Sequence, residues 1–572
     1  MQENLIGTDM GKEILNESLE KLLDKYRGCI VGGAVGDALG YAVEFSSEDS
    51  ISKIYGEHGI TEYELIDGVA QISDDTQMTL FTANGLLLGT TRGKTRGIMG
   101  KYSDYIALCY GEWYRMQWGE YPLEEKYPYT WLVNIPQLYE NREPGHTCLS
   151  ALASFHRGAK GTIEEPINDS KGCGGIMRVA PIGIYFGGKR ISIEDVDMIA
   201  AESAAITHGH DLGYIPAAAL VHIIHLVSHD KDITLLEAVN DMIEKMQELF
   251  ANARHIIEFT DLMEQAVTLS QSDMKDIDAI HMLGEGWVAE ETLAIAIYCA
   301  LRYSTDFKSA IVTAVNHKGD SDSTGAVTGN ILGAYLGMSA IPSQYIENLE
   351  LKDIILELAD DLYNDCKISE YSSYRDEIWE KKYIDKTYKK KEENMSKITL
   401  LNASCADQTV DAVVNAANDG LWAGGGICGV IFKKAGLSQL TAACRQHKTP
   451  LKDGSAVITP AFNMTNAKYI IHAVGPNFSV TPTAFKELFN AYYNSLVVLM
   501  ENDLHSISFP LISSGIFGGK LDNPAAESTK QCCRAYDKFI ADYPDYHIDV
   551  KLCAFSANEM QKAQAVFESY FG

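Results

Sequence analysis

Long apolar runs, paired cysteines and basic charge are all scarce in this chain of 572 residues. No run of eighteen or more apolar residues appears and the start of the chain is polar, which argues against a membrane span and a secretory leader. The twelve cysteines form no C-x-x-C pair, and only Cys532 and Cys533 are adjacent. Such spacing is typical of reduced, buried thiols. We therefore expect a cytoplasmic protein without disulfides.

The shortage of basic charge is confined to the front of the chain. The formal net charge is −30. Residues 397–572 hold 14 basic and 15 acidic side chains, whereas residues 1–396 hold 34 and 63, a net charge of −29. A part this acidic repels nucleic acid and anionic membranes, so neither is expected as a partner. The uneven split also favours two separate units.

Helical patterns dominate the front part. Segments rich in Ala, Leu, Ile and Met recur between residues 21 and 362, and Gly and polar residues separate them. The clearest expected helices cover residues 80–88, 199–206, 215–227, 289–301 and 326–336. No comparable series of strands accompanies them, so this part is predicted to be all-α.

The pattern changes twice after residue 370. Residues 370–394 are rich in Tyr, Lys and Glu, which predicts a solvated helix tail or linker. Strand patterns then alternate with helices, as in an α/β layered domain with a largely parallel or mixed sheet. The expected strands are 398–401, 412–415, 456–459, 469–473, 506–510 and 548–554, and two expected helices are 483–500 and 527–543. The predicted organisation is an extension (1–20), an all-α domain (21–370), a linker (371–396) and an α/β domain (397–572).

Two acidic clusters carry the main chemical signal. Ser73-Asp74-Asp75-Thr76 and Asp320-Ser321-Asp322-Ser323-Thr324 each precede a helical pattern. Acidic residues at a helix start can simply cap it, which is the common reading of one such cluster alone. Oxygen-only ligands, however, suit a hard cation such as Mg²⁺. If folding joins the clusters, they can form a di-metal pocket.

Smaller motifs lie between the clusters. The small-residue run 32–40 permits close helix packing, and Glu44 follows it at a loop. The glycine-rich loop 172–178 offers free N–H groups, although one such loop is weak evidence for a ligand. His208 ends an expected helix, where a lone histidine is more often packed than catalytic.

These motifs stand in an order found in a known family. They are Gly36-Asp37-Ala38-Leu39-Gly40 with Glu44-Phe45, the first acidic cluster, residues 174–181, Thr207-His208, and Gly319 with the second cluster. The order over residues 21–362 resembles the ADP-ribosylglycohydrolase family of the dinitrogenase-reductase activating type. The resemblance implies an all-α fold with two Mg²⁺ ions. It also implies cleavage of the bond between C1″ of ADP-ribose and an acceptor.

Site roles follow from this resemblance by position. The implied metal ligands are Ser73, Asp74, Asp75, Asp320, Asp322 and Ser323. The implied base is one of Glu44, Asp75 and Asp322, and the implied ADP-ribose contacts are Gly174, Gly175, Met177 and His208. Ser73 and Ser323 stand where Thr is usual, and Cys173 where Asn is often found. The acceptor, whether Arg, Ser, Asp/Glu or a nucleobase, is left open.

The back part carries two glycine-rich loops. The segment 414–418 ends an expected strand and leads to Gly424-Gly425-Gly426-Ile427-Cys428-Gly429, while Ser513-Ser514-Gly515-Ile516-Phe517-Gly518 follows the strand at 506–510. Such loops can surround a pyrophosphate with N–H groups, or can merely be tight turns. Neither fits the dinucleotide G-x-G-x-x-G spacing or a P-loop.

This arrangement resembles a macrodomain, the three-layer α/β/α module that binds ADP-ribose, over residues 397–572. By position the resemblance implies ligand contacts at Asn418, Gly425, Gly426, Ile427, Cys428, Gly429, Ser514, Gly515, Ile516, Phe517 and Gly518. The family's early Gly-Asp-Ile-Thr reads Ala403-Ser404-Cys405-Ala406 here, and Cys428 stands where hydrolytic members often carry Asp. Binding is therefore expected more than hydrolysis.

Three functions remain open at this stage. The first is an Mg²⁺-dependent hydrolase that removes ADP-ribose from a modified protein, with the macrodomain holding the substrate. The second is a non-catalytic reader or scaffold, which retention of all four cluster aspartates disfavours. The third is a hydrolase of a small ADP-ribose derivative such as O-acetyl-ADP-ribose. The sequence does not fix the oligomeric state or the physiological target.

Overall fold

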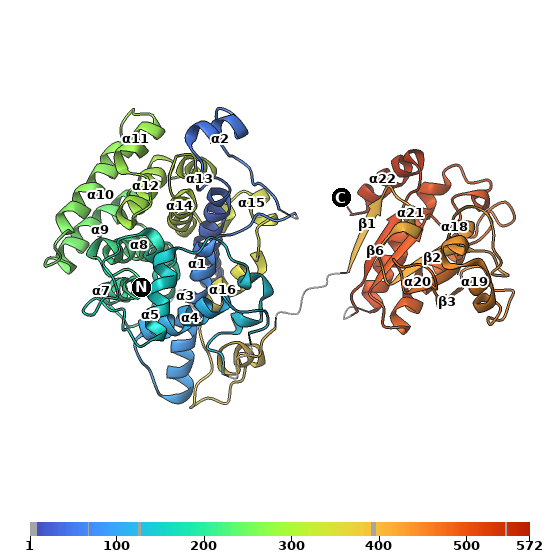
Figure 1. Cartoon of the computed structure of the whole chain (residues 1–572), viewed down its shortest axis with the longest axis horizontal. Coiled ribbons are helices and arrows are strands. Elements are labelled where there is room, and N and C mark those ends of the chain that lie inside the picture. Colours follow the sequence, from blue (N-terminus) through green and yellow to red (C-terminus); the bar gives the residue numbers. More distant parts are fainter. Residues whose placement is uncertain (1–8, 67, 124–126, 390–395, 544–545, 572) are drawn as a thin grey trace. The chain divides into compact units, whose positions relative to one another are not determined.

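The computed structural model describes residues 9–66, 68–123, 127–389, 396–543 and 546–571. It divides the chain into two units, Met1–Lys389 and Lys390–Gly572 (Figure 1). Residues 1–8 of the expected extension lie outside the described residues, and helix α1 begins at Asp9. Residues 390–395 of the expected linker also lie outside them.

The first unit is built from helices, which confirms the predicted class. Its described residues form only isolated β-bridges, such as Gly172 with Val288. The α-helices are α1 (Asp9–Tyr41), α2 (Glu48–Tyr55), α3 (Asp74–Arg96), α4 (Tyr102–Met116), α5 (His146–His156), α6 (Ala180–Tyr185), α7 (Ile193–Ala205), α8 (Asp211–His229), α9 (Leu235–Leu249), α10 (Ile256–Ser270), α11 (Asp276–Leu283), α12 (Ala289–Arg302), α13 (Phe307–Val315), α14 (Ser321–Leu336), α15 (Ser343–Glu347), α16 (Lys352–Asn364) and α17 (Glu377–Trp379). Each of the five clearest expected helices overlaps one of these.

Glycines hold α1 and α14 in backbone contact. A Cβ added to Gly32, Gly36 or Gly40 would lie 2.0–2.4 Å from a carbonyl oxygen of α14. The same holds in reverse, because a Cβ on Gly329 would lie 1.9 Å from the Gly32 oxygen. The small-residue run therefore serves close helix packing. It also sets the start of α14 beside the end of α1, where the site lies.

Helix α8 is long and apolar enough to cross a membrane by length and composition alone. In this unit 78% of the most apolar stretch of α8 is buried, and Ile215, Leu220 and Ile224 are fully enclosed in the core. A buried core helix passes the same test, so the helix is weak evidence for a membrane span.

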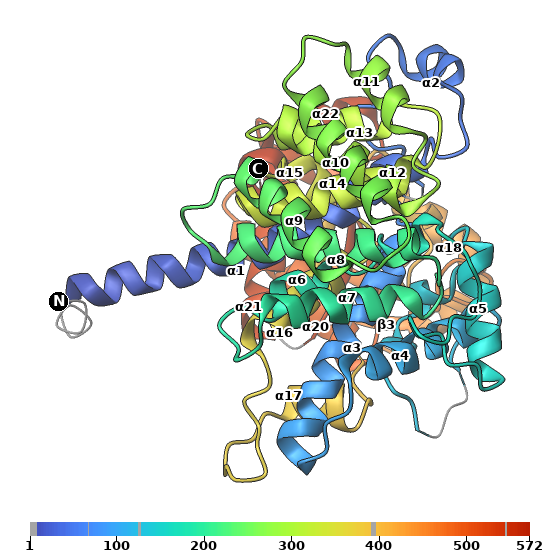
Figure 2. The same cartoon turned by 90° about the vertical axis from the view of Figure 1, so that its left-hand side faces the viewer.

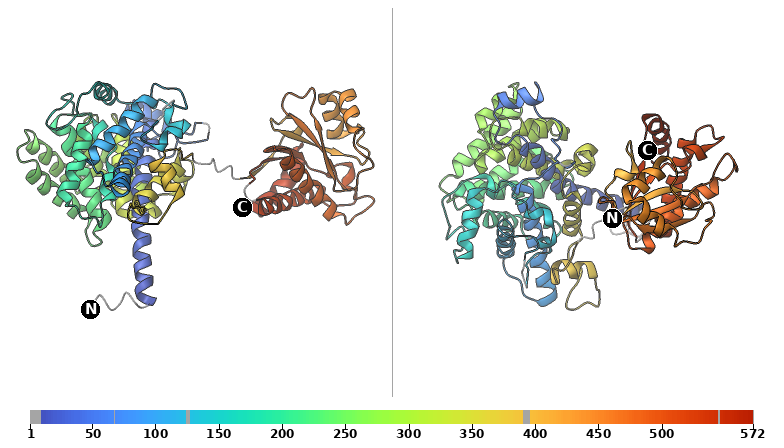
Figure 3. Two further views of the ribbon diagram at one scale, coloured as in Figure 1. Left: turned by 90° about the horizontal axis from the view of Figure 1, so that it is seen from below. Right: turned by 45° about the vertical axis from the view of Figure 1, so that its right-hand side comes forward.

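The N-terminal part of α1 extends away from the other helices of its unit (Figures 2 and 3).

Part of the expected linker packs against the first unit. Trp379 and Tyr383 are buried in the hydrophobic core of the first unit, and Lys382 forms ion pairs with Glu357 and Asp361 there. By its contacts the first unit runs on to Lys389, and the expected domain end at residue 370 stays a prediction. Composition alone does not reveal this packing, because the Tyr and Lys side chains of this segment present apolar surfaces to the core while their polar ends find partners.

The second unit is a three-layer α/β/α domain, as predicted. Its strands are β1 (Lys397–Leu401), β2 (Ala412–Ala417), β3 (Ala456–Pro460), β4 (Tyr469–Val474), β5 (Ser506–Pro510) and β6 (Asp549–Cys553). Its helices are α18 (Gly426–Ala435), α19 (Leu437–Cys444), α20 (Phe485–Glu501), α21 (Pro524–Asp542) and α22 (Ala557–Phe571). The sheet order is β1-β6-β5-β2-β4-β3, with only β3 antiparallel to its neighbour.

Two cores flank this sheet. Residues of α20 and α21 fill one core, and residues of α18 and α19 fill the other. Strands β2 and β5 are adjacent and parallel, so their carboxyl ends lie at one edge of the sheet. Ligands of open α/β sheets bind outside such ends. The two glycine-rich loops leave the sheet at this edge.

Candidate functional sites

Helix starts position both acidic clusters. Ser73 is the N-cap of α3, and its hydroxyl accepts the N–H of Asp75 at 3.2 Å. Asp320 is the N-cap of α14, and its carboxylate accepts the N–H of Ser323 at 3.2 Å. Capping is thus real at both helices. Capping engages only the Ser73 hydroxyl and one Asp320 oxygen, Oδ1.

The fold brings the two clusters together. Ser323 Oγ donates to Asp75 Oδ2 at 2.9 Å, a contact between residues 248 positions apart. One carboxylate oxygen from each of Glu44, Asp320 and Asp322 lies within 4.8 Å of the others. Residues from the end of α1 and the starts of α3 and α14 therefore share one pocket.

Burial makes this pocket electrostatically unusual. Asp74, Asp75, Asp320 and Asp322 are each at most 6% exposed. Burial, reinforced by Asp322, raises the pKa of Asp74, Asp75 and Asp320 well above the usual range. Burial and the neighbouring aspartates likewise raise the pKa of Glu44 to about 10. Ionised carboxylates at this density need compensating positive charge.

The donor set fits hard divalent cations. The side chains that line the pocket offer carboxylate and hydroxyl oxygens, which Mg²⁺ and Ca²⁺ prefer. Glu44 Oε2 is buried without any hydrogen-bond partner among the described residues. An acceptor left unpaired in this way is costly unless a proton, water or cation meets it.

Asp37 belongs to the Gly36–Gly40 motif, but the sequence assigns it no role. It is fully buried on α1 and accepts the N–H groups of Ser73 and Thr76 at 3.0 and 3.1 Å. It therefore holds the start of α3 against α1. Burial first, and Asp322 second, raise its pKa to about 7. Asp37 follows Gly36, whose backbone contacts α14. An acidic residue next to a glycine of a close helix contact is the sequence signal that points to a buried role for Asp37.

The glycine-rich loop reaches the pocket through Cys173. Its thiol donates to Asp320 Oδ2 at 2.7 Å. Gly174 lies against the His208 ring, and a Cβ on Gly175 would strike the Gly213 oxygen at 2.9 Å. The loop and His208 are thus neighbours, but both are packed inside the unit.

Met177 and His208 are likewise buried, at 3% and 1% exposure. Burial, followed by the charge of Arg178, lowers the pKa of His208 to about 3, so its ring stays neutral. Thr207 Oγ1 lies 2.8 Å from His208 Nδ1 and also accepts from Arg178. Both residues have a packing role in this arrangement.

A cavity of about 870 Å³ opens at the carboxyl ends of β2, β5 and β6. Nine of the eleven residues expected to contact a ligand line it, namely Asn418, Gly425, Gly426, Ile427, Cys428, Ser514, Gly515, Ile516 and Phe517. Gly425 is the N-cap of α18, so the start of that helix faces the cavity. A helix start favours a negatively charged group.

Two expected contacts are not among the lining residues. A Cβ on Gly429 would meet the Gly424 oxygen at 2.7 Å, and one on Gly518 would meet Pro524 at 2.8 Å. Both glycines therefore permit close chain packing instead of lining the cavity. Trp422 and Phe555, which had no assigned role, do line it and are 59% and 77% exposed. Exposed aromatic rings beside a cavity could have been sought in the loops after β2 and β6.

Asn418 and Cys428 are engaged with the loop between them. Asn418 donates to the Trp422 oxygen at 2.8 Å and accepts the Trp422 N–H at 3.1 Å. Cys428 Sγ accepts the N–H of Gly424 at 3.3 Å. These bonds shape the glycine loop around the cavity. The thiol of Cys428 stands where hydrolytic members of the family often carry an Asp carboxylate.

The fold and the two sites define a two-domain protein. Its first domain is all-helical and encloses a buried group of oxygen ligands. Its second is an α/β/α domain with a cavity at its strand ends. Residues 18–370 match the ADP-ribosylglycohydrolase family, and residues 414–527 match the macro domain. The chain belongs to the ADP-ribosylglycohydrolase family and carries a C-terminal macrodomain.

Similar proteins match the second unit. The ADP-ribose glycohydrolase MACROD1 of Mus musculus is 37% identical over 176 residues, which are 30% of this chain and 52% of that protein. The O-acetyl-ADP-ribose deacetylase of Salmonella gallinarum is 37% identical over 151 residues, 26% of this chain and 82% of that protein. A solved Oceanobacillus iheyensis macrodomain with ADP is 29% identical, covering 31% of this chain and 92% of that one, at a TM-score of 0.28. The chain thus spans about half of the mouse relative.

Proposed function

We propose that the first unit hydrolyses the bond between ADP-ribose and a modified acceptor in a reaction that depends on two Mg²⁺ ions. The observation that supports this most is the contact of Ser323 Oγ with Asp75 Oδ2, since it makes one pocket of two distant clusters. Membership of the ADP-ribosylglycohydrolase family supports the reaction class. The raised carboxylate pKa values support a need for cations.

The ligands proposed for the two ions are Ser73, Asp74, Asp75, Asp320, Asp322 and Ser323. Bound Mg²⁺ would neutralise the carboxylates and stabilise charge on sugar oxygens as the glycosidic bond breaks. The N-cap hydrogen bonds hold the Ser73 hydroxyl and the Asp320 carboxylate in place before substrate arrives.

Glu44 is the proposed base. Its Oε2 is unpartnered, whereas Asp75 Oδ2 accepts from Ser323 and Asp322 Oδ1 accepts the Ser323 N–H. Glu44 would take a proton from the water that attacks C1″ and return one to the departing acceptor. The net reaction then adds one water across the bond.

The macrodomain is proposed to hold ADP-ribose or an ADP-ribosylated target. The cavity volume, the helix start at Gly425 and the two glycine loops support binding of a pyrophosphate. Cys428 in place of Asp favours binding over hydrolysis in this unit. Tethering a binder to a hydrolase raises the effective concentration of modified target at the active site.

A release assay on Arg-, Ser- and Glu-linked ADP-ribose, with Mg²⁺ or with chelator, tests the proposal. We expect release from at least one linkage, which chelator abolishes and added Mg²⁺ restores. Release that is equal with chelator would contradict the metal role. Binding of ADP-ribose without release from any linkage would favour the reader function instead.

A further inference from the structure

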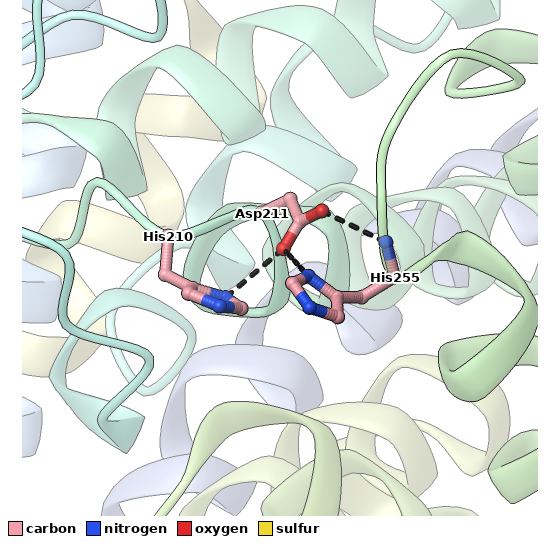
Figure 4. Close-up of side chains that lie close together, drawn as sticks. All are labelled: His210, Asp211 and His255. Atoms are coloured by element: carbon pink, nitrogen blue, oxygen red, sulfur yellow. Dashed lines mark hydrogen bonds and ion pairs between the residues drawn. The ribbon is translucent and has the colours of Figure 1, made fainter.

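A second cluster of metal-binding groups lies in the first unit (Figure 4). His210 and Asp211 stand at the start of α8, and His255 stands immediately before α10. His255 Nδ1 lies 2.7 Å from Asp211 Oδ1, and His210 Nδ1 lies 3.0 Å from the same oxygen. Two imidazoles from separate helix starts thus converge on one carboxylate.

The tautomer of His210 decides what these contacts are. The Leu212 N–H donates to His210 Nδ1 at 3.0 Å and to Asp211 Oδ1 at 2.9 Å. A neutral His210 that accepts this bond carries its proton on Nε2, and its Nδ1 lone pair then lies beside Asp211 Oδ1. In this tautomer a cation could be bound by His210 Nδ1 and Asp211 Oδ1, and by His255 Nδ1 once that nitrogen has lost its proton.

Two of the three separations between the candidate ligand atoms are near those of a tetrahedral metal site. Ligands about 2.0–2.1 Å from zinc stand about 3.3 Å apart in a tetrahedron. The observed 2.7 and 3.0 Å separations require an expansion of only a few tenths of an ångström. Nitrogen and carboxylate ligands of this kind suit zinc rather than magnesium.

The surroundings hold the ligands in place. Asp211 Oδ2 accepts the His255 backbone N–H at 3.0 Å, which fixes the carboxylate plane. The two imidazole rings stack at 4.6 Å with 25° between their planes. The three side chains are 12–24% exposed, so water can complete the coordination. Supporting hydrogen bonds of this type are usual around metal ligands.

We propose that His210, Asp211 and His255 bind Zn²⁺ and thereby join the start of α8 to the start of α10. This site is separate from the carboxylate pocket and does not depend on the proposed hydrolysis. A hydrogen bond connects this site to the glycine-rich loop that reaches the carboxylate pocket. The His210 N–H donates to the oxygen of Ser170, which precedes that loop, at 3.3 Å. Bound zinc would fix the loop that carries His208.

The test uses the full chain after treatment with chelator. Zn²⁺ affinity is measured by competition with a chromophoric chelator, and Co²⁺ is added as a spectroscopic substitute. Tetrahedral Co²⁺ with imidazole ligands absorbs visible light far more strongly than Co²⁺ in an octahedral oxygen site. His210→Asn is the main variant, because Asn remains a good N-cap for α8. His255→Gln is the second, and Asp322→Asn removes a ligand from the carboxylate pocket.

We expect a Zn²⁺ ion that Asp322→Asn retains and that His210→Asn and His255→Gln bind at least about tenfold more weakly. The intense Co²⁺ band should follow the same pattern. His281→Gln, which removes an exposed histidine paired with Glu48, is the matched control and should bind as the unaltered chain does. Zinc that is lost in Asp322→Asn but kept in His210→Asn would overturn the proposal, as would equal affinity in all variants. Circular dichroism confirms that each variant is folded.

Discussion

At the scale of single residues, the carboxylate pocket makes a prediction about Asp322. Asp322 raises the pKa of Asp74, Asp75 and Asp320, so it repels them all in the metal-free state. Asp322→Asn should therefore raise the melting temperature without metal, while it removes most of the stabilisation by Mg²⁺ and lowers kcat/KM at least about 100-fold. Calorimetry and the release assay measure both effects. Asp104→Asn, at the exposed start of α4, should change neither.

The same carboxylates predict how stability depends on pH. Burial raises the pKa of Asp37 to about 7 and that of Glu44 to about 10, both above their values in the unfolded chain. The folded state therefore binds more protons. The stability that protonated Asp37 contributes is lost as pH rises from about 4 to about 7, and that of protonated Glu44 as pH rises from about 4 towards 10. Thermal unfolding in chelator should show this fall, and Mg²⁺ should reduce it. Stability that rises with pH in chelator would refute this charge assignment.

At the scale of elements, the contact of α1 with α14 sets the pocket. A Cβ on Gly329 would lie 1.9 Å from the Gly32 oxygen, so Gly329→Ala must push the helices apart. We expect a loss of about 1–3 kcal/mol or more in unfolding free energy, and weaker Mg²⁺ binding because the clusters separate. Denaturant titration measures the first quantity.

The matched control is another buried helical glycine with room beside it. A Cβ on Gly111 in α4 would come no closer than 3.4 Å to a neighbour, the His156 ring, with a Phe155 ring atom at 3.9 Å. Gly111→Ala should thus be neutral or stabilise by up to about 1 kcal/mol. Equal losses in both variants would mean that helix contact is not the cause.

The sequence predicts the positions of the helices and strands better than it predicts the contacts within the site. All six strands were expected within about two residues, because short apolar runs there end at Gly, Asn or Pro. The convergence of the two acidic clusters is a hypothesis that no local pattern can establish, since it depends on how α3 and α14 both pack against α1. The ligand contacts expected at Gly429 and Gly518, which are not among the cavity's lining residues, stay predictions. A glycine needed for ligand approach and one needed for chain packing look alike in sequence.

At the scale of the whole molecule, the proposal assigns hydrolysis to the first unit and ADP-ribose binding to the second. This assignment can be tested without knowing how the two units are placed. Gly425 has no atom within 4 Å of an added Cβ and lines the macrodomain cavity, so Gly425→Glu should fold normally. The new carboxylate would repel a pyrophosphate, and ADP-ribose binding to the second unit should fall at least about tenfold. The first unit keeps its own pocket, so release from a small ADP-ribose compound should be unchanged.

Release from a modified protein at low concentration should slow in Gly425→Glu, because the tether no longer raises the local substrate concentration. The loss should disappear at saturating substrate, so KM rises while kcat is kept. Gln446→Glu adds the same charge at an exposed position that is not among the cavity's lining residues and should leave both constants unaltered. A fall in kcat on the small compound would instead assign catalysis to the macrodomain. That outcome would make the second unit a hydrolase despite Cys428, and the carboxylate pocket of the first unit would need another role.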